Sequence, residues 1–289
     1  MRLIRKLTYL SILSLFITFL GGCTKTDSAN SIPSYIEVEE FYLSTSSIEG
    51  TDSHRISDAW VFVNDNLMGV FELPARVPTL ATGAQNVKIF AGIKRNGQSD
   101  DRIRYPFYTH FEGTVDLIPD STVLINPTIG YIDDLDIWEE NFEDGGISFT
   151  KTVLSDTNFA QDNSDPFEGS KSGVVSFGPD DLFFEARTNE PSFDNFPKVG
   201  QPVYLELDYR SNNSFVFGIY NNDGSLPADA QLAIFTFSPK EYWNKTYINL
   251  TDAVSGLSSA NEFDIYFSAF NNGETAIPKI EMDNIKIVF

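Results

Sequence analysis

The feature that most constrains the fold is a period-two alternation of apolar and polar residues that recurs along the chain. Its clearest instance is the segment PVYLELDYR at residues 202–210. One set of its side chains is expected to face one way (Val203, Leu205, Leu207, Tyr209) and the other set the opposite way (Tyr204, Glu206, Asp208, Arg210). Such alternation is typical of a strand with one buried face. We therefore predict an all-β chain.

The first half of the chain contains several such segments separated by turn-forming residues. YIEVEEFYL, at 35–43, alternates and then slips phase at Glu39-Glu40, which predicts a bulge within one strand. DAWVFVNDNLMGVFEL, at 58–73, predicts two strands around the turn at 64–66, and NVKIFAGIKRNG predicts a strand ending at Asn96-Gly97. Two further strands are expected within 110–131. Short strands at this spacing favour an antiparallel sandwich.

A domain boundary is expected in the acidic segment YIDDLDIWEE, at residues 131–140. Acidic, solvated segments with little packing are plausible joints between domains. We place the boundary near Asp133, which gives one β-sandwich over 35–132 and a second β-rich domain over 133–289.

The N-terminal segment has the pattern of a secretory signal. Arg2, Arg5 and Lys6 precede an almost wholly apolar run of about 14 residues at 7–20. That run is shorter than the roughly 20 residues that a helix needs to cross a bilayer. A basic start followed by an apolar run of this length predicts a signal peptide over residues 1–22.

The residues Leu20-Gly21-Gly22-Cys23 resemble the lipobox of bacterial lipoproteins, in which the signal is cut before a cysteine that carries lipid. Cys23 is the single cysteine of the chain, so it cannot form an internal disulfide. The resemblance implies a covalent lipid on Cys23 and a flexible tether over 23–34. It also implies a protein that sits on a membrane through its lipid without spanning it. The two-domain layout, rather than this segment, favours the outer membrane, and the cell surface over the periplasmic face.

Charge and motif content exclude several functions. The chain has 41 acidic and 20 basic residues, for a net charge of −21. Nucleic-acid binding needs a basic footprint, so we expect none. The two histidines, His54 and His110, are not spaced as metal ligands, and no G-x-S-x-G elbow occurs. We predict a protein that is not an enzyme.

The segment AWVFVNDNLMGVFELP, followed by Gly83 and VKIFAG, resembles the PEGA-type surface repeat of bacterial envelope proteins. The match spans about 35 residues, and Val70-Phe71-Glu72-Leu73-Pro74 replaces the Thr-Pro step of that family. The resemblance implies a small Ig-like β-sandwich outside the cytoplasm.

The second half resembles the jelly-roll sandwich of the galactose-binding-like and carbohydrate-binding-module group. The resemblance is carried by NFEDG at 141–145, FEGSKSGVVSF at 167–177, a W-x4-I-x-L pattern from Trp243, and MDNIKI at 282–287. It implies a C-terminal jelly roll. The whole chain is therefore expected to be an Ig-like antiparallel sandwich followed by a jelly roll.

Many members of that group hold one structural calcium ion, which suggests candidate ligands here. Calcium prefers six to eight oxygen ligands from carboxylates and carbonyls. Asn141 and Glu143 share a face if they lie in a strand, and Asp283 interrupts the phase of the last strand. Carbonyls near Gly169 and Ser170 would complete the site. The alternative is that Asp283 only caps a turn or solvates a bulge.

Two binding functions remain. Accessory lipoproteins of Bacteroidota resemble this layout, which implies an interaction subunit of an outer-membrane protein complex for transport, secretion or barrel assembly. The alternative is glycan capture through Tyr242 and Trp243, or through Phe193 and Phe196, although core packing also explains these rings. A row of exposed aromatic rings would favour glycan binding, and a broad, flat apolar patch would favour binding of a protein partner.

Two short segments resemble the D-[S/T]-x acceptor for O-glycosylation in Bacteroidota. They are Asp27-Ser28-Ala29 and Asp120-Ser121-Thr122. The resemblance implies modification of Ser28 and Ser121.

Overall fold

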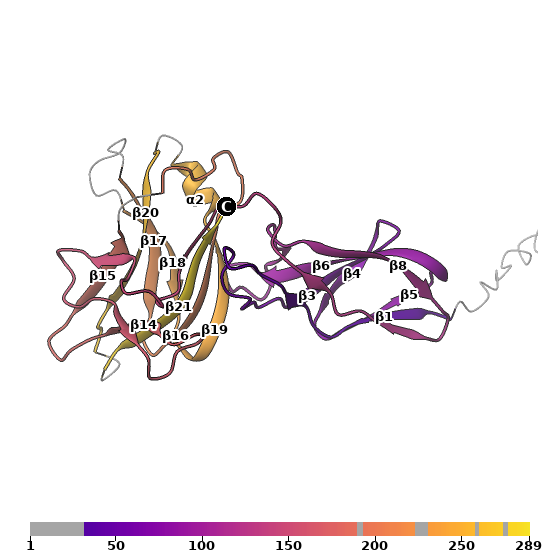
Figure 1. Cartoon of the computed structure of the whole chain (residues 1–289), viewed down its shortest axis with the longest axis horizontal. Coiled ribbons are helices and arrows are strands. Elements are labelled where there is room, and N and C mark those ends of the chain that lie inside the picture. Colours follow the sequence, from indigo (N-terminus) through magenta and orange to yellow (C-terminus); the bar gives the residue numbers. More distant parts are fainter. Residues whose placement is uncertain (1–31, 190–192, 223–230, 258–259, 274–276) are drawn as a thin grey trace, which may run out of the picture.

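The computed structural model describes residues 32–189, 193–222, 231–257, 260–273 and 277–289. They form two β-sandwiches that lie end to end, so the described part of the molecule is elongated (Figure 1). The single α-helix among the described elements is α2 (Thr251–Gly256), and the rest are strands. The all-β prediction is confirmed. No helix within these ranges is long and apolar enough to cross a membrane.

The N-terminal sandwich packs two sheets around one core. One sheet has the order β5-β1-β9, the other has the order β4-β3-β6-β7 with β8 also paired to β6, and β2 pairs with β10 beside them. The strands are β1 (Ser34–Val38), β2 (Tyr42–Leu43), β3 (Asp58–Val63), β4 (Asn66–Glu72), β5 (Ala75–Thr79), β6 (Gly83–Lys94), β7 (Arg102–Arg104), β8 (His110–Leu117), β9 (Thr122–Leu124) and β10 (Thr128–Ile129). Most pairs are antiparallel, but β1 with β9 and β2 with β10 are parallel.

The predicted hairpin around residues 64–66 forms between β3 and β4, and β6 ends at Lys94, just before the predicted turn at Asn96-Gly97. Asn64 and Asp65 have φ of 49° and 62°, and Asn96 and Gly97 have φ of 54° and 66°. Asn, Asp and Gly tolerate this left-handed conformation, which matches the twist of the flanking strands.

The predicted bulge at Glu39-Glu40 is instead a break between two strands. The chain leaves β1 after Val38 and re-enters pairing at Tyr42. Asn126 Oδ1 accepts hydrogen bonds from the main-chain nitrogens of Glu39 and Glu40, at 3.0 and 3.4 Å. A side chain therefore replaces the missing sheet partner across the gap.

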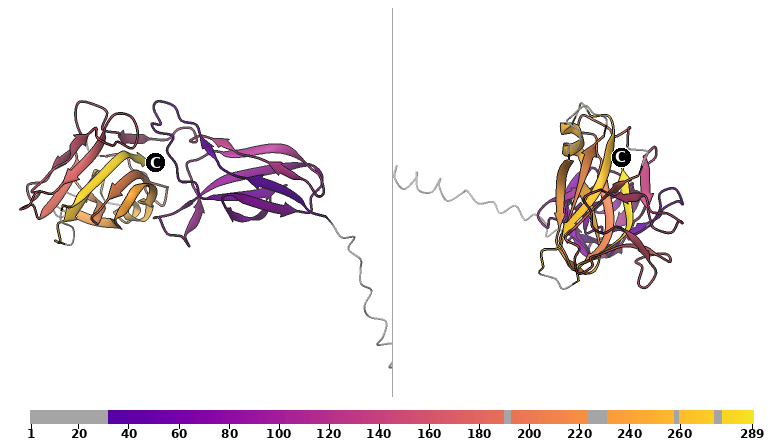
Figure 2. Two further views of the ribbon diagram at one scale, coloured as in Figure 1. Left: turned by 90° about the horizontal axis from the view of Figure 1, so that it is seen from below. Right: turned by 90° about the vertical axis from the view of Figure 1, so that its left-hand side faces the viewer.

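The C-terminal sandwich packs a six-stranded sheet on a five-stranded sheet (Figure 2). The first has the order β13-β14-β21-β16-β19, with β11 paired to β21, and the second has the order β12-β15-β20-β17-β18. The strands are β11 (Ile137–Glu140), β12 (Phe149–Lys151), β13 (Ala160–Asp162), β14 (Ser172–Ser176), β15 (Phe183–Thr188), β16 (Tyr204–Ser211), β17 (Phe215–Asn221), β18 (Gln231–Phe237), β19 (Lys240–Asn249), β20 (Phe263–Phe270) and β21 (Lys279–Val288).

β16 shows how the alternating pattern is used. Leu205, Leu207 and Tyr209 point into the C-terminal core, as predicted. The opposite face is also buried, because the N-terminal sandwich packs against it. Tyr204 belongs to the N-terminal core, and Glu206 and Asp208 have no exposed surface. Our expectation that β16 is buried on one face only was wrong.

A buried charge network holds this junction together. Glu206 Oε1 accepts hydrogen bonds from the hydroxyls of Tyr105 and Tyr131, at 2.7 and 2.9 Å. Lys245 Nζ lies 3.5 Å from Glu206 Oε2 and 3.2 Å from Asp208 Oδ2. Burial disfavours the charged form of Lys245 and so lowers its pKa. The nearby carboxylates of Asp208 and Glu206 together have the larger effect, so the pKa of Lys245 is raised. Two buried carboxylates thus share one buried lysine, and two tyrosine hydroxyls stabilise the charge of Glu206 further.

A second lysine joins the two sandwiches through main-chain atoms. Lys286 Nζ donates to the carbonyl oxygens of Glu49 and Thr51, in a loop of the N-terminal sandwich, and lies 3.8 Å from Glu139 Oε1. Its side chain is fully buried, and burial lowers the pKa of Lys286.

The turn after β6 also pairs with the edge of the six-stranded sheet. Asn96 N donates to Tyr247 O, and Asn249 N donates to Asn96 Oδ1, both at 2.9 Å. The connection between the sandwiches, from Tyr131 to Ile137, is itself packed, because Leu135 and Ile137 contact the N-terminal core. These contacts fix the orientation of one sandwich on the other.

Removing the central carboxylate tests this junction. Glu206→Ala leaves two tyrosine hydroxyls without their acceptor and Lys245 with less compensation. We expect the free energy of unfolding to fall by about 3–5 kcal/mol, as measured by urea denaturation. The exposed Glu112 is a control, and Glu112→Ala is expected to change little. If Glu206→Ala and the unmodified chain unfold at the same urea concentration, the network does not stabilise the junction.

Candidate functional site

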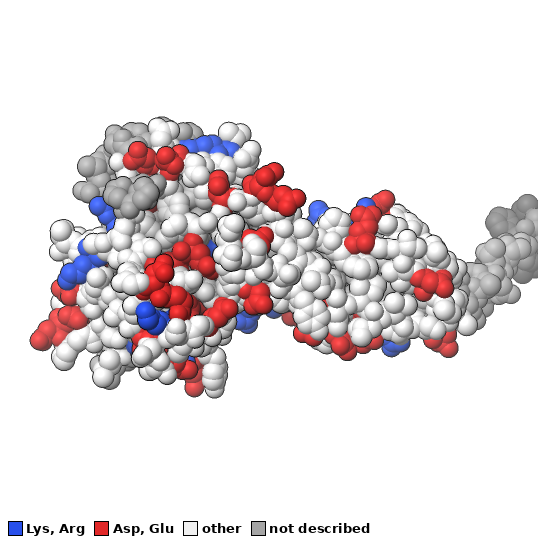
Figure 3. Space-filling model, in the orientation of Figure 1, with Lys and Arg blue, Asp and Glu red and all other residues white. Residues whose placement is uncertain are grey.

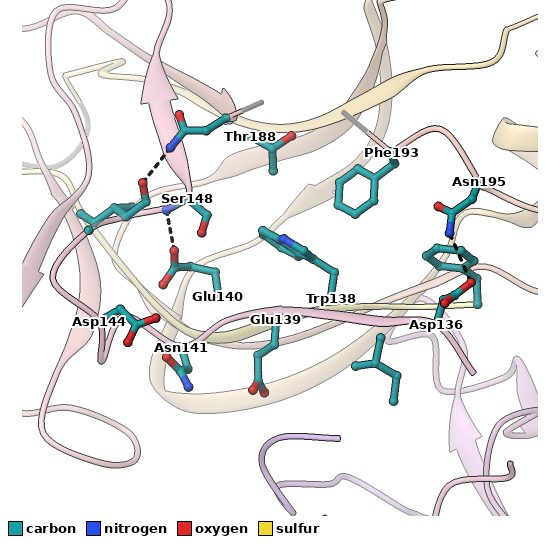
Figure 4. A pocket seen from close by; sticks show the side chains of 15 residues that line it. Asp136, Trp138, Glu139, Glu140, Asn141, Asp144, Ser148, Thr188, Phe193 and Asn195 are labelled. Carbon is teal, nitrogen blue, oxygen red and sulfur yellow. Dashed lines mark hydrogen bonds between the residues drawn. The ribbon is translucent and has the colours of Figure 1, made fainter. Parts of the chain in front are cut away.

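A cleft of about 700 Å³ opens beside β11 at the edge of the C-terminal sandwich (Figure 4). Three segments far apart in the sequence form it: residues 136–148, the end of β15 at Thr188-Asn189, and residues 193–195, with Phe289 also in its lining. We call it the Trp138 cleft. Its volume falls in the range of about 300–1,000 Å³ that is typical of small-molecule sites.

Two half-buried aromatic rings, Trp138 and Phe193, form the apolar part of this cleft (Figure 4). Their centroids are 5.5 Å apart and their planes cross at 82°. Phe193 stacks at 4.9 Å on Phe196, which is 4% exposed, and Trp138 contacts Phe149 at 6.0 Å. The core therefore holds both rings in place while part of each stays accessible.

Polar side chains surround the rings. On one side, Asn195 Nδ2 donates to Asp136 Oδ2 at 3.2 Å. On the other side are the exposed Asp144 and Asn189, whose Nδ2 donates to Ile147 O at 2.9 Å. The cleft thus offers carboxylate acceptors and amide donors within one apolar-floored space.

The buried Glu140 shapes the loop that borders the cleft. Its carboxylate accepts hydrogen bonds from the main-chain nitrogens of Phe142 and Ser148, at 2.6 and 2.5 Å. Phe142 has φ of 59°, and its side chain is buried in the C-terminal core. One carboxylate thus fixes both ends of the loop before any ligand binds.

A second cleft of about 700 Å³ lies on the outer face of the five-stranded sheet. The carboxylate of Glu185 accepts from Tyr220 OH at 2.8 Å and from Gln231 Nε2 at 2.7 Å. Asp264 Oδ2 lies 3.7 Å from Arg187 Nη1, and the buried Asp264 Oδ1 has no hydrogen-bond partner among the described residues. The charged residues of this cleft include both signs, whereas those of the Trp138 cleft are all acidic. The tyrosine of this second cleft, Tyr220, is buried.

The four predicted glycan-binding aromatics do not share one surface. Phe193 lines the Trp138 cleft, and Phe196 lies behind it in the core. Tyr242 is 76% exposed, whereas Trp243 is half-buried with Arg210 5.0 Å from its ring. Because Tyr242 and Trp243 are neighbours in β19, they point to opposite faces of the sheet.

Sequence reasoning missed Trp138. It lies in the acidic segment 131–140, which we interpreted as a solvated joint. The available signal was the apolar pair Ile137-Trp138 within the acidic segment. These residues lie in β11, which pairs with β21 through Trp138 and Ile287.

The residues predicted to bind calcium are close together, and hydrogen bonds already occupy their oxygens. Glu143 Oε1 accepts from the main-chain nitrogens of Ser170 and Lys171, both at 2.8 Å, and Oε2 accepts from Ser170 Oγ at 2.6 Å. The Ser170 hydroxyl and these amides lower the pKa of Glu143. Gly169, with φ of 63°, lets this turn wrap around the carboxylate.

The strand geometry expected for Asn141 and Glu143 was wrong, because β11 ends at Glu140 and both residues lie in the following loop. Asp283 does lie at a register shift between β16 and β21. Its carboxylate accepts from the main-chain nitrogens of Glu168 and Asn284, at 3.2 and 2.9 Å. Within the described ranges, no group of three or more His, Cys, Asp or Glu residues could hold a metal ion. Calcium binding stays a prediction.

The predicted modification sites are only partly described. Cys23 and Ser28 lie outside the described residues. Ser121 is exposed in the turn between β8 and β9, and its main-chain nitrogen donates to Ile118 O at 3.1 Å. Lipid on Cys23 and sugar on either serine stay predictions.

Comparisons with known proteins find structural similarity alone. No protein-family model matches the chain, and no curated protein matches it. Among solved structures, the family 11 carbohydrate-binding module from Clostridium thermocellum, in complex with a β-1,3-1,4-mixed-linked tetrasaccharide, is 16% identical, with a TM-score of 0.39. The match covers 53% of this chain and 94% of that one.

Two other solved structures give similar values. The CBM22-1 xylan-binding domain from Paenibacillus barcinonensis Xyn10C is 12% identical, with a TM-score of 0.38 over 53% of this chain and 93% of that one. The K2 cleaved adhesin domain of Lys-gingipain is 12% identical, with a TM-score of 0.37. That match covers 53% of this chain and 97% of the adhesin domain. At these TM-scores the similarity does not identify a ligand.

The raised pKa of the Asp283 carboxyl predicts that the free energy of unfolding depends on pH. Burial raises the pKa of Asp283 from its usual value of 3.8 to about 7, although the Glu168 and Asn284 amides oppose this rise. A carboxyl whose folded pKa is raised contributes stability below its unfolded pKa and loses it as the pH rises through the folded pKa. Relative to the unmodified chain, Asp283→Asn is therefore expected to gain stability between pH 5 and pH 8, by at most about 1.4 kcal/mol per pH unit.

Urea denaturation of both proteins at pH 5, 6, 7 and 8 measures this difference. Asp156→Asn is the matched control, because amides of Leu182 and Phe183 lower the pKa of Asp156 and its effect is constant above pH 5. A pH-independent difference for Asp283→Asn would contradict the prediction.

Proposed function

We propose that the chain is a carbohydrate-binding protein of the cell surface, and that the Trp138 cleft is its binding site. The single observation that carries the proposal is the pairing of two core-anchored, partly accessible rings with a polar rim in one cleft. We further propose that it is exported, lipid-anchored through Cys23 at the outer membrane, and not an enzyme.

The physical basis is the mixed character of a sugar ring. Its C–H groups form an apolar face that packs against an aromatic ring, and its hydroxyls need hydrogen-bond partners around the edge. Trp138 and Phe193 cross at 82°, so a sugar that lies on one ring meets the edge of the other. Asp136 and Asn195 then supply an acceptor and a donor on one side, and Asp144 and Asn189 supply them on the other.

Pre-formed geometry adds to the expected affinity. The rings are held by core contacts with Phe149 and Phe196, and the bordering loop is held by Glu140. Groups that are already ordered lose little conformational entropy when ligand binds. The role as a subunit of an outer-membrane protein complex stays a prediction, and none of the described contacts tests it.

Variants of the cleft test the proposal. A glycan array with the full chain in detergent identifies a ligand, and titration calorimetry then measures its dissociation constant. Asp136→Ala/Asn195→Ala removes exposed hydrogen-bonding groups and is expected to weaken binding by about 10-fold or more, because two hydrogen bonds contribute roughly 1–3 kcal/mol. Trp138→Phe keeps an aromatic ring but reduces the stacking area, so binding is expected to weaken with little loss of stability.

The control is Tyr242→Ala, which removes an exposed ring that lines neither of the two clefts described above. It should bind as the unmodified chain does. The proposal fails if no glycan binds, or if Tyr242→Ala weakens binding and the cleft variants do not.

A further inference from the structure

A third cleft, of about 320 Å³, lies where the two sandwiches meet, at the β19 edge of the six-stranded sheet. We call it the junction cleft. Its cationic residues are Arg55 and Lys94 from the N-terminal sandwich and Lys240 and Lys245 from the C-terminal sandwich, and it has no Asp or Glu in its lining. This composition is unusual in a chain with 41 acidic and 20 basic residues. Acidic side chains are spread over both sandwiches in Figure 3.

Two of these four cations lack a negatively charged partner. Lys245 is paired with Glu206 and Asp208, and Lys94 Nζ lies 3.2 Å from Glu72 Oε1. Within the described ranges, neither Arg55 nor Lys240 lies within 4.0 Å of a carboxylate oxygen. The junction cleft therefore holds two positive charges that the protein itself does not neutralise.

Arg55, from the N-terminal sandwich, is held in position by β19 of the C-terminal sandwich. Its main-chain nitrogen donates to Tyr247 OH at 3.0 Å, and its guanidinium donates to Asn244 Oδ1. Burial raises the pKa of the neighbouring Tyr209, and the positive charge of Arg55 acts on that pKa in the opposite direction. Arg55 thus points toward the C-terminal side of the junction cleft, where Lys240 and Ser238 also lie.

We propose that the junction cleft binds an oxyanion, a carboxylate or sulfate group, with Arg55 and Lys240 as its charged ligands. A planar guanidinium bonds two oxygens of such a group, and an ammonium supplies a further charge. Hydroxyl and amide groups of Ser57, Asn96, Ser99 and Ser238 line the same space. The net charge of the chain repels anions elsewhere, so the local field selects this cleft.

This site is separate from the Trp138 cleft. β11 and β19 form opposite edges of the six-stranded sheet, with β21 and β16 between them. Either cleft can therefore bind its ligand without the other, and failure of one proposal leaves the other intact.

A nuclear magnetic resonance titration of the full chain in detergent tests the proposal. The probes are sodium sulfate, sodium D-glucuronate and uncharged D-glucose, at an ionic strength held constant with sodium chloride. Sulfate and glucuronate are expected to shift the amide signals of residues 96–99, Ser238 and Lys240, whereas glucose is expected to leave them unchanged. Tighter binding of glucuronate than of sulfate would indicate an oxyanion carried by a sugar. Equal or weaker binding of glucuronate would indicate a free oxyanion. Either result supports an oxyanion site in the junction cleft.

Charge-removing variants complete the test. Arg55→Gln/Lys240→Gln is expected to weaken glucuronate binding by at least 10-fold, with an unchanged circular dichroism spectrum. The matched control is Lys151→Gln, an exposed lysine on the five-stranded sheet, which should bind normally. The proposal is overturned if glucose causes the same shifts, if the shifts appear elsewhere, or if the double variant binds as the unmodified chain does.

Discussion

The arrangement of the whole molecule depends on the buried carboxylate of Glu206. It accepts hydrogen bonds from two tyrosines of the N-terminal sandwich and pairs with a lysine of its own sheet. A buried charge is tolerated only when its partners are in place, so the C-terminal sheet is complete only with the N-terminal sandwich docked on it. This docking leaves the β11 edge open for the Trp138 cleft and closes the β19 edge into the junction cleft.

The alternating pattern predicted strands and inner faces well, but it could not show what covers an outer face. Leu205 and Leu207 are core residues as expected, because period-two alternation directly reports the two sides of a strand. Glu206 and Asp208 have the polarity of solvated residues, yet both are fully buried. The tyrosines that cover Glu206 come from residues 105 and 131, and no local pattern connects these positions to β16.

The candidate site was predicted only in part for the same reason. Phe193 was chosen for its aromatic ring, but its neighbour in the cleft, Trp138, comes from a segment interpreted as a joint. The predicted pair of Tyr242 and Trp243 is divided between two sheet faces by strand geometry alone. A candidate cleft assembled from segments at three positions in the sequence needs the tertiary fold before its members can be recognised.

The hydrogen bonds between the Asn96 turn and β19 have a consequence for contacts between neighbouring molecules. An unpaired strand edge is a template on which another chain can add a strand, which leads to aggregation. The turn occupies the main-chain groups of Tyr247 and Asn249, so part of this edge is already closed within each molecule. The same contact that orients the two sandwiches thus keeps neighbouring copies from joining edge to edge at that position.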